Sequence, residues 1–402
     1  IRRDKLCLSY LPLELPPILK ILRSYCNKSE QSGENVFKQP PVRFFIQLWI
    51  SGTMNASQCE RMLSMDYPNT VTRIHQFVDA GIVPGVSYGI IDRDGLQTDV
   101  FGQQELLPER LPLHSGELYD LASLTKVIGT TNLILRLLAS GKISLDDSLT
   151  KYFPQWQSPQ VTIRHLLTHT SDIVGYIPNR NQLPKSELMP ALLALKSGSD
   201  IGKVVHYQDY NFIFLGWIAS RVMGEPVQQL ISEFVLRPLE LNQATFTPDQ
   251  VNNVVPTELI PSKGLIRGTV HDPKARILGP DCGSAGLFAP LSDLIHFSKW
   301  LLGDIRYPNF LPADWVDQLF VDQTPGHMKN RSFGWILRHY NGHPYILHTG
   351  YTGTLIVVDR YSHKALVFLS NRVHPDPSNQ LFLPYRSQLI RTFVKENEIA
   401  HQ

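Results

Sequence analysis

The chain has 402 residues, of which 43% are hydrophobic and 18% are charged, a composition typical of a globular protein with a large core. Its formal net charge is +2, from 38 basic and 36 acidic residues, so no overall field favours nucleic acid or an anionic membrane as a partner. Small molecules or peptides are therefore the expected partners. No apolar run approaches the roughly 20 residues of a membrane-spanning helix.

The four cysteines lie far apart in the chain, at Cys7, Cys26, Cys59 and Cys282. They form no C-x-x-C pair and no Cys/His cluster, so the sequence predicts neither a disulfide framework nor a zinc site. The most apolar early stretch, FFIQLWI, is too short and lies too late to be a signal peptide. We therefore expect a cytoplasmic protein with no metal and no cofactor.

Residues 1–65 mix proline, cysteine and charge without a sustained hydrophobic period, and the chain begins with Ile. We interpret them as an N-terminal extension, either disordered or artefactual, and expect the folded domain over residues 66–398. The stretch TVTRIHQFVDAG at 70–81 has the period of an amphipathic helix that ends at a glycine. The following GVSYGIIDRDGLQTDVFG at 85–102 predicts two strands joined by an Asp-Gly turn.

The middle of the chain, from about 123 to 302, is mainly helical by its hydrophobic period. Strands return from Ser332 onward in SFGWILRHY, HPYILHTG, GTLIVVDR and KALVFLSNR, before a closing helix. Strands at both ends predict an α/β (α+β) fold, with one antiparallel sheet built from about 68–105 and 332–396. Helices flank this sheet, and the middle segment forms a helical lobe.

The tetrapeptide SLTK occurs at 123–126 and again at 148–151. A serine becomes a nucleophile when a base takes its proton, and on a helix a lysine three residues later lies on the same face. The first copy opens a long apolar stretch, which predicts a helix with Ser123 near its N-terminus, where free N–H groups favour negative charge. Pro154 ends any helix after the second copy, so Ser148 is interpreted as structural.

Two further polar motifs adjoin predicted elements. The sequence His348-Thr349-Gly350 lies between two strands, where a polar side chain can face a cleft and a glycine permits close approach of a substrate. Tyr207 and Asp209 precede an apolar helix. Taken singly, these motifs fit structural roles equally well, as a strand-end histidine, a half-buried aromatic and a helix cap.

Three motifs follow one another along the chain: Ser123-x-x-Lys126, Tyr207-x-Asp209 and His348-Thr349-Gly350. Together they resemble the active-site motifs of the serine β-lactamase-like superfamily. The resemblance runs from about 74 to 393 and is greatest to class C β-lactamases, low-molecular-weight penicillin-binding proteins and β-lactamase-fold esterases. It implies a β-lactamase/transpeptidase-like fold and a serine hydrolase that acts through an acyl-enzyme on a small-molecule ester, amide or peptide.

The chain departs from that family pattern at three positions. Asp209 stands where many relatives have asparagine, and an ionised carboxylate accepts hydrogen bonds but cannot donate one to a substrate carbonyl. His348 stands where β-lactamases usually have lysine, and Asp172 stands where a glycine is common. The first two changes weaken a β-lactamase assignment more than an esterase or peptidase assignment, while Asp172 is expected to affect a loop.

The resemblance implies that Ser123 attacks a carbonyl while Lys126, alone or with Tyr207, takes its proton. For Lys126 to act as a base, its pKa must fall from roughly 10.4 toward neutrality. The oxyanion would be held by the backbone N–H groups of Ser123 and Tyr351, with His348 lining the opposite wall. Asp209, Thr349 and Gly350 complete the expected substrate-binding residues.

Carboxylester hydrolysis is the favoured activity, because peptidoglycan lies outside the membrane and the chain is expected in the cytoplasm. A DD-peptidase (penicillin-binding protein) and a β-lactamase are the enzymatic alternatives, and a non-catalytic ligand-binding module is a further one. His165 and His169 have the spacing of two zinc ligands but lack the glutamate of H-E-x-x-H. His271 and Asp272 are expected either to line the cleft or to order a loop.

Overall fold

The structure is a computed structural model that describes residues 67–327 and 329–396; the expected N-terminal extension lies outside the described residues. Its α-helices are α4 (Pro68–Asp79), α5 (Thr131–Ala139), α6 (Leu149–Tyr152), α7 (Ile163–Leu167), α8 (Lys185–Leu193), α9 (Asp209–Met223), α10 (Val227–Ile231), α11 (Pro273–Leu278), α12 (Leu291–Leu302), α13 (Ala313–Asp317) and α14 (Phe382–Lys395). Shorter helical turns are η3 (Lys126–Thr130), η4 (Ser232–Leu236), η5 (Val251–Asn253), η6 (Gly279–Asp281) and η7 (Gln318–Phe320). None of the described helices is both long enough and apolar enough to cross a bilayer.

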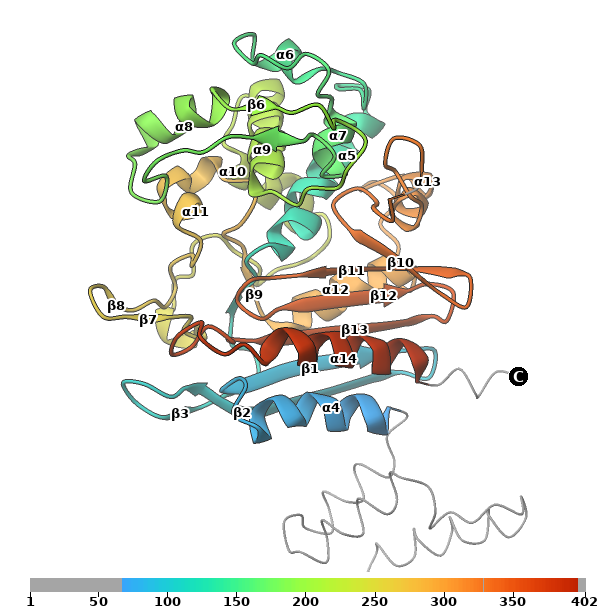
Figure 1. Cartoon of the computed structure of the whole chain (residues 1–402). Coiled ribbons are helices and arrows are strands. Elements are labelled where there is room, and N and C mark those ends of the chain that lie inside the picture. Colours follow the sequence, from blue (N-terminus) through green and yellow to red (C-terminus); the bar gives the residue numbers. More distant parts are fainter. Residues whose placement is uncertain (1–66, 328, 397–402) are drawn as a thin grey trace, which may run out of the picture. The chain divides into compact units, whose positions relative to one another are not determined.

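The strands are β1 (Gly85–Ile91), β2 (Leu96–Glu105), β3 (Leu111–Pro112), β4 (Tyr119–Asp120), β5 (Ile173–Val174), β6 (Lys196–Ser197), β7 (Leu259–Ile260), β8 (Gly264–Leu265), β9 (Phe288–Ala289), β10 (Ile336–Tyr340), β11 (His343–Thr349), β12 (Leu355–Asp359) and β13 (Lys364–Ser370). Seven of them form an antiparallel sheet in the order β10-β11-β12-β13-β1-β2-β3. Figure 1 shows the early strands β1 and β2 beside the late strands β10 to β13. This arrangement confirms the predicted sheet from both ends of the chain.

Strand β1 is buried along its whole length, which requires cover on both faces of the sheet. Tyr88 lies opposite Phe368 of β13, and the ring of Phe77 lies 5.0 Å from that of Phe368. Because side chains alternate along a strand, Gly89 faces the other side, where a Cβ would stand 2.9 Å from Ile295 of α12. Helix α12 therefore packs closely on this second face.

The described residues divide into two units, and the larger runs from His75 to Ser387. In the described part of the smaller unit, the carboxylate of Glu396 accepts hydrogen bonds from the N–H groups of Asn69 and Thr70, at 2.6 and 2.7 Å. The rings of Tyr67 and Phe393 stack there with their centroids 5.8 Å apart. The single-domain bounds expected from the sequence stay a prediction.

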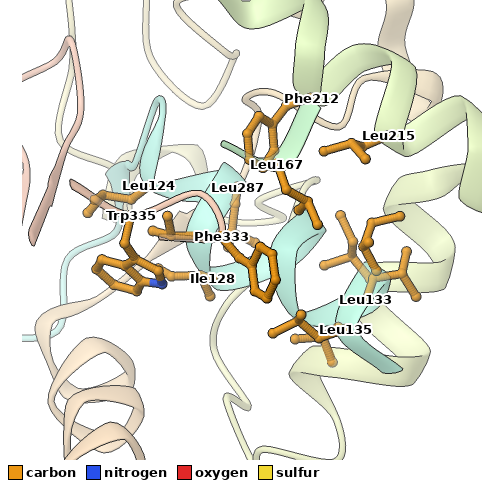
Figure 2. Close-up of a cluster of buried hydrophobic side chains, with 14 of the residues drawn as sticks. Leu124, Ile128, Leu133, Leu135, Leu167, Phe212, Leu215, Leu287, Phe333 and Trp335 are labelled. Atoms are coloured by element: carbon orange, nitrogen blue, oxygen red, sulfur yellow. The ribbon is translucent and has the colours of Figure 1, made fainter. Parts of the chain in front are cut away.

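The helix expected after Ser123 forms, but it is not α-helical throughout. Residues Lys126–Thr130 make a π-helical turn, η3, before the chain continues as α5. All residues of η3 are buried, and Figure 2 shows Leu124 and Ile128 within a cluster that also includes Leu133, Leu135, Leu167, Phe212, Leu215, Leu287, Phe333 and Trp335. Close packing of this kind resists small displacements, so it fixes the segment that carries Ser123 and Lys126.

Candidate active site

Ser123 follows β4 in a tight turn. Ala122, the residue before it, has a φ of +45°, a left-handed conformation that non-glycine residues seldom adopt. The buried carboxylate of Asp120 stabilises the turn, because it accepts hydrogen bonds from the N–H of Ala122 at 2.8 Å and of His271 at 2.6 Å. Burial raises the pKa of Asp120 above its ordinary value, while these two hydrogen bonds oppose the shift. The turn brings Ser123 to the start of the buried helix.

Lys126 reaches back to Ser123 as the spacing predicts. Its Nζ donates to Ser123 Oγ at 2.8 Å and to the backbone carbonyl of Ser284 at 2.9 Å. The lysine side chain is fully buried. A buried ammonium group must be paired or hydrogen-bonded to be tolerated, and these two oxygens supply part of that requirement.

Asp209 supplies the negative charge. It is the first residue of α9, and its Oδ1 lies 2.8 Å from Lys126 Nζ. Its Oδ2 lies 3.1 Å from the Nζ of a second buried lysine, Lys274, which also pairs with Asp272 at 2.9 Å. Asp209 therefore bridges two lysines, and its side chain does not cap α9 as the alternative reading of the sequence suggested.

The expected fall in the pKa of Lys126 is wrong for this arrangement. Burial by itself would lower the pKa, but the carboxylate of Asp209, followed by Tyr207, outweighs burial and raises the pKa above its ordinary value. The same contacts act on Asp209: burial would raise its pKa, but Lys126 and Lys274 hold it well below its usual range. The pair is thus stable as an ammonium and a carboxylate.

Tyr207 lies above this ion pair with 44% of its surface exposed. The centre of its ring is 5.3 Å from Lys126 Nζ, 5.6 Å from the guanidinium carbon of Arg331 and 4.6 Å from the ring of His169. Arg331 is only 7% exposed and makes no ion pair within residues 67–327 and 329–396. Burial lowers its pKa to about 10, so it stays a cation at neutral pH.

His348, near the end of β11, is 2% exposed, and its ring centre lies 6.0 Å from that of Tyr207. Neither ring nitrogen has a hydrogen-bond partner in the described part of the chain. Burial, with the nearby charges of Arg331 and Lys126, holds the pKa of His348 well below its usual range. The imidazole is therefore neutral, and β11 offers the site no permanent cation.

The chain after His348 closes against the turn that holds Ser123. Thr349 ends β11, and a Cβ on Gly350 would stand 2.6 Å from the carbonyl oxygen of Leu121, a contact that only glycine tolerates. Tyr351 follows with 53% of its surface exposed. For the backbone N–H groups of Ser123 and Tyr351, no acceptor lies among the described residues. Both groups are thus available to an oxyanion.

The loop residues singled out in the sequence have structural partners. His271 stacks on Tyr351 at 5.5 Å, and its Nε2 lies 2.9 Å from a carboxylate oxygen of Glu258. Asp272 caps α11 by accepting from the N–H of Ala275 at 2.8 Å. Asp172 accepts from the N–H of Asp200 at 2.9 Å, so it does shape a loop.

The second SLTK has no such arrangement. Ser148 caps the short helix α6 and donates to the carbonyl of Pro159 at 2.7 Å, while Lys151 is turned to Asp147 at 2.8 Å and is 56% exposed. The structure therefore does not bring Ser148 and Lys151 together.

The two histidines of HLLTH do not share a helix face. His165 lies in α7 and accepts from the N–H of Thr162, whereas His169 lies beyond the end of α7 with a φ of +56°. Among the residues that the structure describes, no three His, Cys, Asp or Glu side chains gather as a metal site would require.

Sequence reasoning missed Lys274 and Arg331. Lys274 had a usable signal: it follows Asp272-Pro273 in the first turn of a helix, where the helix dipole disfavours a cation. A lysine in that position needs acidic neighbours. Arg331 carries no comparable signal, because an arginine before a strand is ordinary on a protein surface.

The chain is similar to known proteins in sequence and in fold. A family model described as "Beta-lactamase" matches residues 71–386. A protein of Escherichia coli O157:H7 named "Putative D-alanyl-D-alanine carboxypeptidase" is 29% identical over 362 residues, which cover 75% of this chain and 81% of that protein.

Two solved structures share the fold. One is "A class C beta-lactamase", with a TM-score of 0.68 and 19% identity over 83% of this chain and 98% of that one. The other is "EstCE1, a hydrolase with promiscuous acyltransferase activity", with a TM-score of 0.65 and 18% identity over 80% of this chain and 97% of that one.

Proposed function

Since the chain belongs to the Beta-lactamase family and is a serine hydrolase of that superfamily, we propose that it cleaves acyl compounds through an acyl-enzyme on Ser123. The contact of 2.8 Å between Ser123 Oγ and the buried Lys126 Nζ carries this proposal. A nucleophile and a base within hydrogen-bond reach, with the base itself oriented by a third group, are the signature of covalent catalysis. Asp209 is the orienting group here.

In the proposed reaction, Lys126 first loses a proton to solvent and then accepts the hydroxyl proton of Ser123 as the serine attacks the carbonyl carbon. The same proton passes to the leaving group when the tetrahedral intermediate collapses. Such acid–base help contributes about 10² to 10⁴ in rate. Because Asp209 favours the charged lysine, the reactive fraction grows about tenfold with each pH unit below the pKa of Lys126.

The proposed oxyanion donors are the backbone N–H groups of Ser123 and Tyr351. The contact of Gly350 with Leu121 supports this role, since it holds the two segments that carry these groups against each other. Thr349 and the neutral ring of His348 would line the wall of the site, and Tyr207 would cover Lys126. A neutral imidazole can donate one hydrogen bond to a substrate without attracting an anion.

Peptides that end in D-alanine are the proposed substrates. The name of the E. coli relative, which matches over most of its length, supports this class. Arg331 also supports it, because a buried guanidinium without an ion-pair partner in the described residues suits the terminal carboxylate of such a peptide.

Carboxylester hydrolysis is the second candidate. The exposed rings of Tyr207 and Tyr351 favour it, since they offer an apolar surface to an acyl chain, and the neutral His348 does not demand an anionic group. The cytoplasmic location expected from the sequence also favours esters, because cell-wall peptides lie outside the membrane.

The test compares D-alanine release from diacetyl-L-lysyl-D-alanyl-D-alanine with hydrolysis of p-nitrophenyl butyrate. The parent protein, Ser123→Ala and Ser148→Ala are measured side by side. We expect turnover in the parent and in Ser148→Ala, and its loss in Ser123→Ala. Faster use of the peptide supports the carboxypeptidase, and faster use of the ester supports the esterase. Full activity of Ser123→Ala would refute the mechanism, and labelling of Ser123 without turnover would favour a binding module.

A further inference from the structure

Lys274 occupies a position that helix electrostatics disfavour. It is the second residue of α11, directly after the N-cap Asp272 and Pro273. The N-terminus of a helix carries a partial positive charge, which repels a cation in the first turn. The side chain is nevertheless only 9% exposed, so it gains little stabilisation from water.

Two carboxylates hold Lys274 in this place. Its Nζ lies 2.9 Å from Asp272 Oδ2 and 3.1 Å from Asp209 Oδ2. Asp272 also caps the N-terminus of α11, because its Oδ1 accepts a hydrogen bond from the N–H of Ala275. The Asp209 contact connects Lys274 to the candidate active site, since the other oxygen of that carboxylate binds Lys126.

We propose that Lys274 is a positioning residue that weakens the hold of Asp209 on the proton of Lys126, and so sets the pH at which Lys126 becomes a base. The proposal rests on the acyl transfer proposed above. Lys274 acts in two ways: it occupies the second oxygen of Asp209, and it adds a positive charge that disfavours the ammonium form of Lys126.

The other groups around Lys126 do not replace this effect. Ser123 and the carbonyl of Ser284 are uncharged hydrogen-bond partners, and the ring of Tyr207 lies 5.3 Å away. Asp209 is the one carboxylate in ion-pair contact with Lys126 within the described part of the chain. The nearby His348 and His169 are held neutral by burial.

Arg331 adds a further cation near Tyr207, but it does not contact Asp209 in the structure. The balance between Asp209 and Lys274 therefore dominates the proton affinity of Lys126. A unit charge about 6 Å away at an effective dielectric constant of about 20 shifts a pKa by about 1 to 2 units.

The experiment measures kcat/KM against pH for the better of the two substrates above. Lys274→Gln removes the charge but keeps a hydrogen-bond donor, and Lys274→Met removes both. In either variant we expect the acid limb of the profile to move to higher pH by about 1 to 2 units, which lowers kcat/KM on that limb by about 10- to 100-fold. Lys274→Arg, which keeps the charge, should retain the limb of the parent.

A matched control comes from the second SLTK. Lys151→Met breaks an ion pair whose length, 2.8 Å, equals that of Lys126 with Asp209, but at an exposed position. It should leave the profile unchanged. Asp209→Asn tests the opposite change in charge next to Lys126. Loss of the carboxylate should lower the proton affinity of Lys126 and so move the acid limb to lower pH.

The outcomes separate this inference from the proposed function. Activity that survives in Ser123→Ala would refute the function itself. An inactive Ser123→Ala together with an unmoved or lowered acid limb in the Lys274 variants would overturn only the role of Lys274. A loss of kcat/KM in Lys274→Arg as large as the loss in Lys274→Gln would likewise overturn it, because the effect would then not follow the charge at this position.

Discussion

Replacing Asp209 with asparagine should destabilise the fold while it makes Lys126 easier to deprotonate. The carboxylate bridges Lys126 and Lys274, which are 0% and 9% exposed. The asparagine side chain has one uncharged acceptor oxygen, whereas the aspartate carboxylate has two oxygens that share a negative charge. Two buried ammonium groups would therefore compete for one weak acceptor.

The magnitude follows from the surroundings of each group. Removing one partner of a buried ion pair typically destabilises a protein by about 3 to 5 kcal/mol. Two features reduce this value, because Lys274 keeps Asp272 at 2.9 Å and the side chain of Asp209 is 28% exposed to water. The contribution of Lys126 to this loss of stability also has an upper limit, because the lysine can lose its proton instead of remaining an unpaired buried cation. Neutralising an ordinary lysine at pH 7 costs about 4.6 kcal/mol. We expect a net loss of about 2 to 4 kcal/mol.

Urea unfolding of the parent and of Asp209→Asn at several pH values checks this expectation. The folded-state pKa of Asp209 lies below its unfolded value, so its stabilisation is fully present above the unfolded pKa of about 3.9 and is lost as the pH falls through the folded-state pKa. The difference between the two proteins should therefore be constant from about pH 7 to pH 5 and shrink below about pH 4.

Asp200→Asn is the control for this measurement. Asp200 pairs with Lys203 at 3.6 Å, and both side chains are more than half exposed. Its loss should change stability by no more than about 0.5 kcal/mol. If Asp209→Asn is no more destabilising than Asp200→Asn, the Asp209 carboxylate does not stabilise the two buried lysines.

Three further changes test other parts of the site. Lys126→Met should lower the urea midpoint less than Asp209→Asn does, because Asp209 keeps Lys274 as an ion-pair partner, and kcat/KM should fall by at least about 100-fold. Gly350→Ala should cost about 1 to 3 kcal/mol in urea unfolding and reduce kcat, because the new Cβ meets the carbonyl of Leu121; a variant with parental stability and rate would contradict the tight contact. Addition of EDTA should leave the rate of the proposed hydrolysis unchanged, and a loss that Zn²⁺ restores would contradict the metal-free mechanism.

Much of the fold could be read from local patterns. The Asp94-Gly95 turn between two predicted strands indicates the β1–β2 hairpin, and the apolar period after Ser123 predicts a helix, both of which the structure confirms. The pairing of β1 with β13 joins distant parts of the chain, which no local pattern encodes. The hydrophobic period also does not predict the π-helical turn at Lys126–Thr130, because one turn with a different hydrogen-bond spacing barely changes the pattern of a long helix.

The candidate site shows the same division. The spacing of Ser123 and Lys126 predicts their contact, since both lie on one helical segment. The electrostatic setting of Lys126 could not be predicted, because Asp209 and Lys274 come from two other helices and meet it only in the folded protein. When the contact of Lys126 with Asp209 is not known, burial is the main expected influence on the pKa of Lys126. The pKa is then expected to fall, whereas in the structure it is raised.

The charges of the site explain how it accommodates two departures from the family pattern. Asp209 in place of asparagine adds a negative charge, and His348 in place of lysine removes a positive charge. Together these two differences would make the net charge of the site two units more negative than in the family pattern. Lys274 and Arg331 place two buried positive charges in this site, one in contact with Asp209 and the other close to Tyr207. The positive charge is thereby carried by α11 and by the segment before β10, while β11 stays neutral. A substrate that depends on a lysine of β11 for its acidic group should consequently bind less well than one whose carboxylate reaches Arg331.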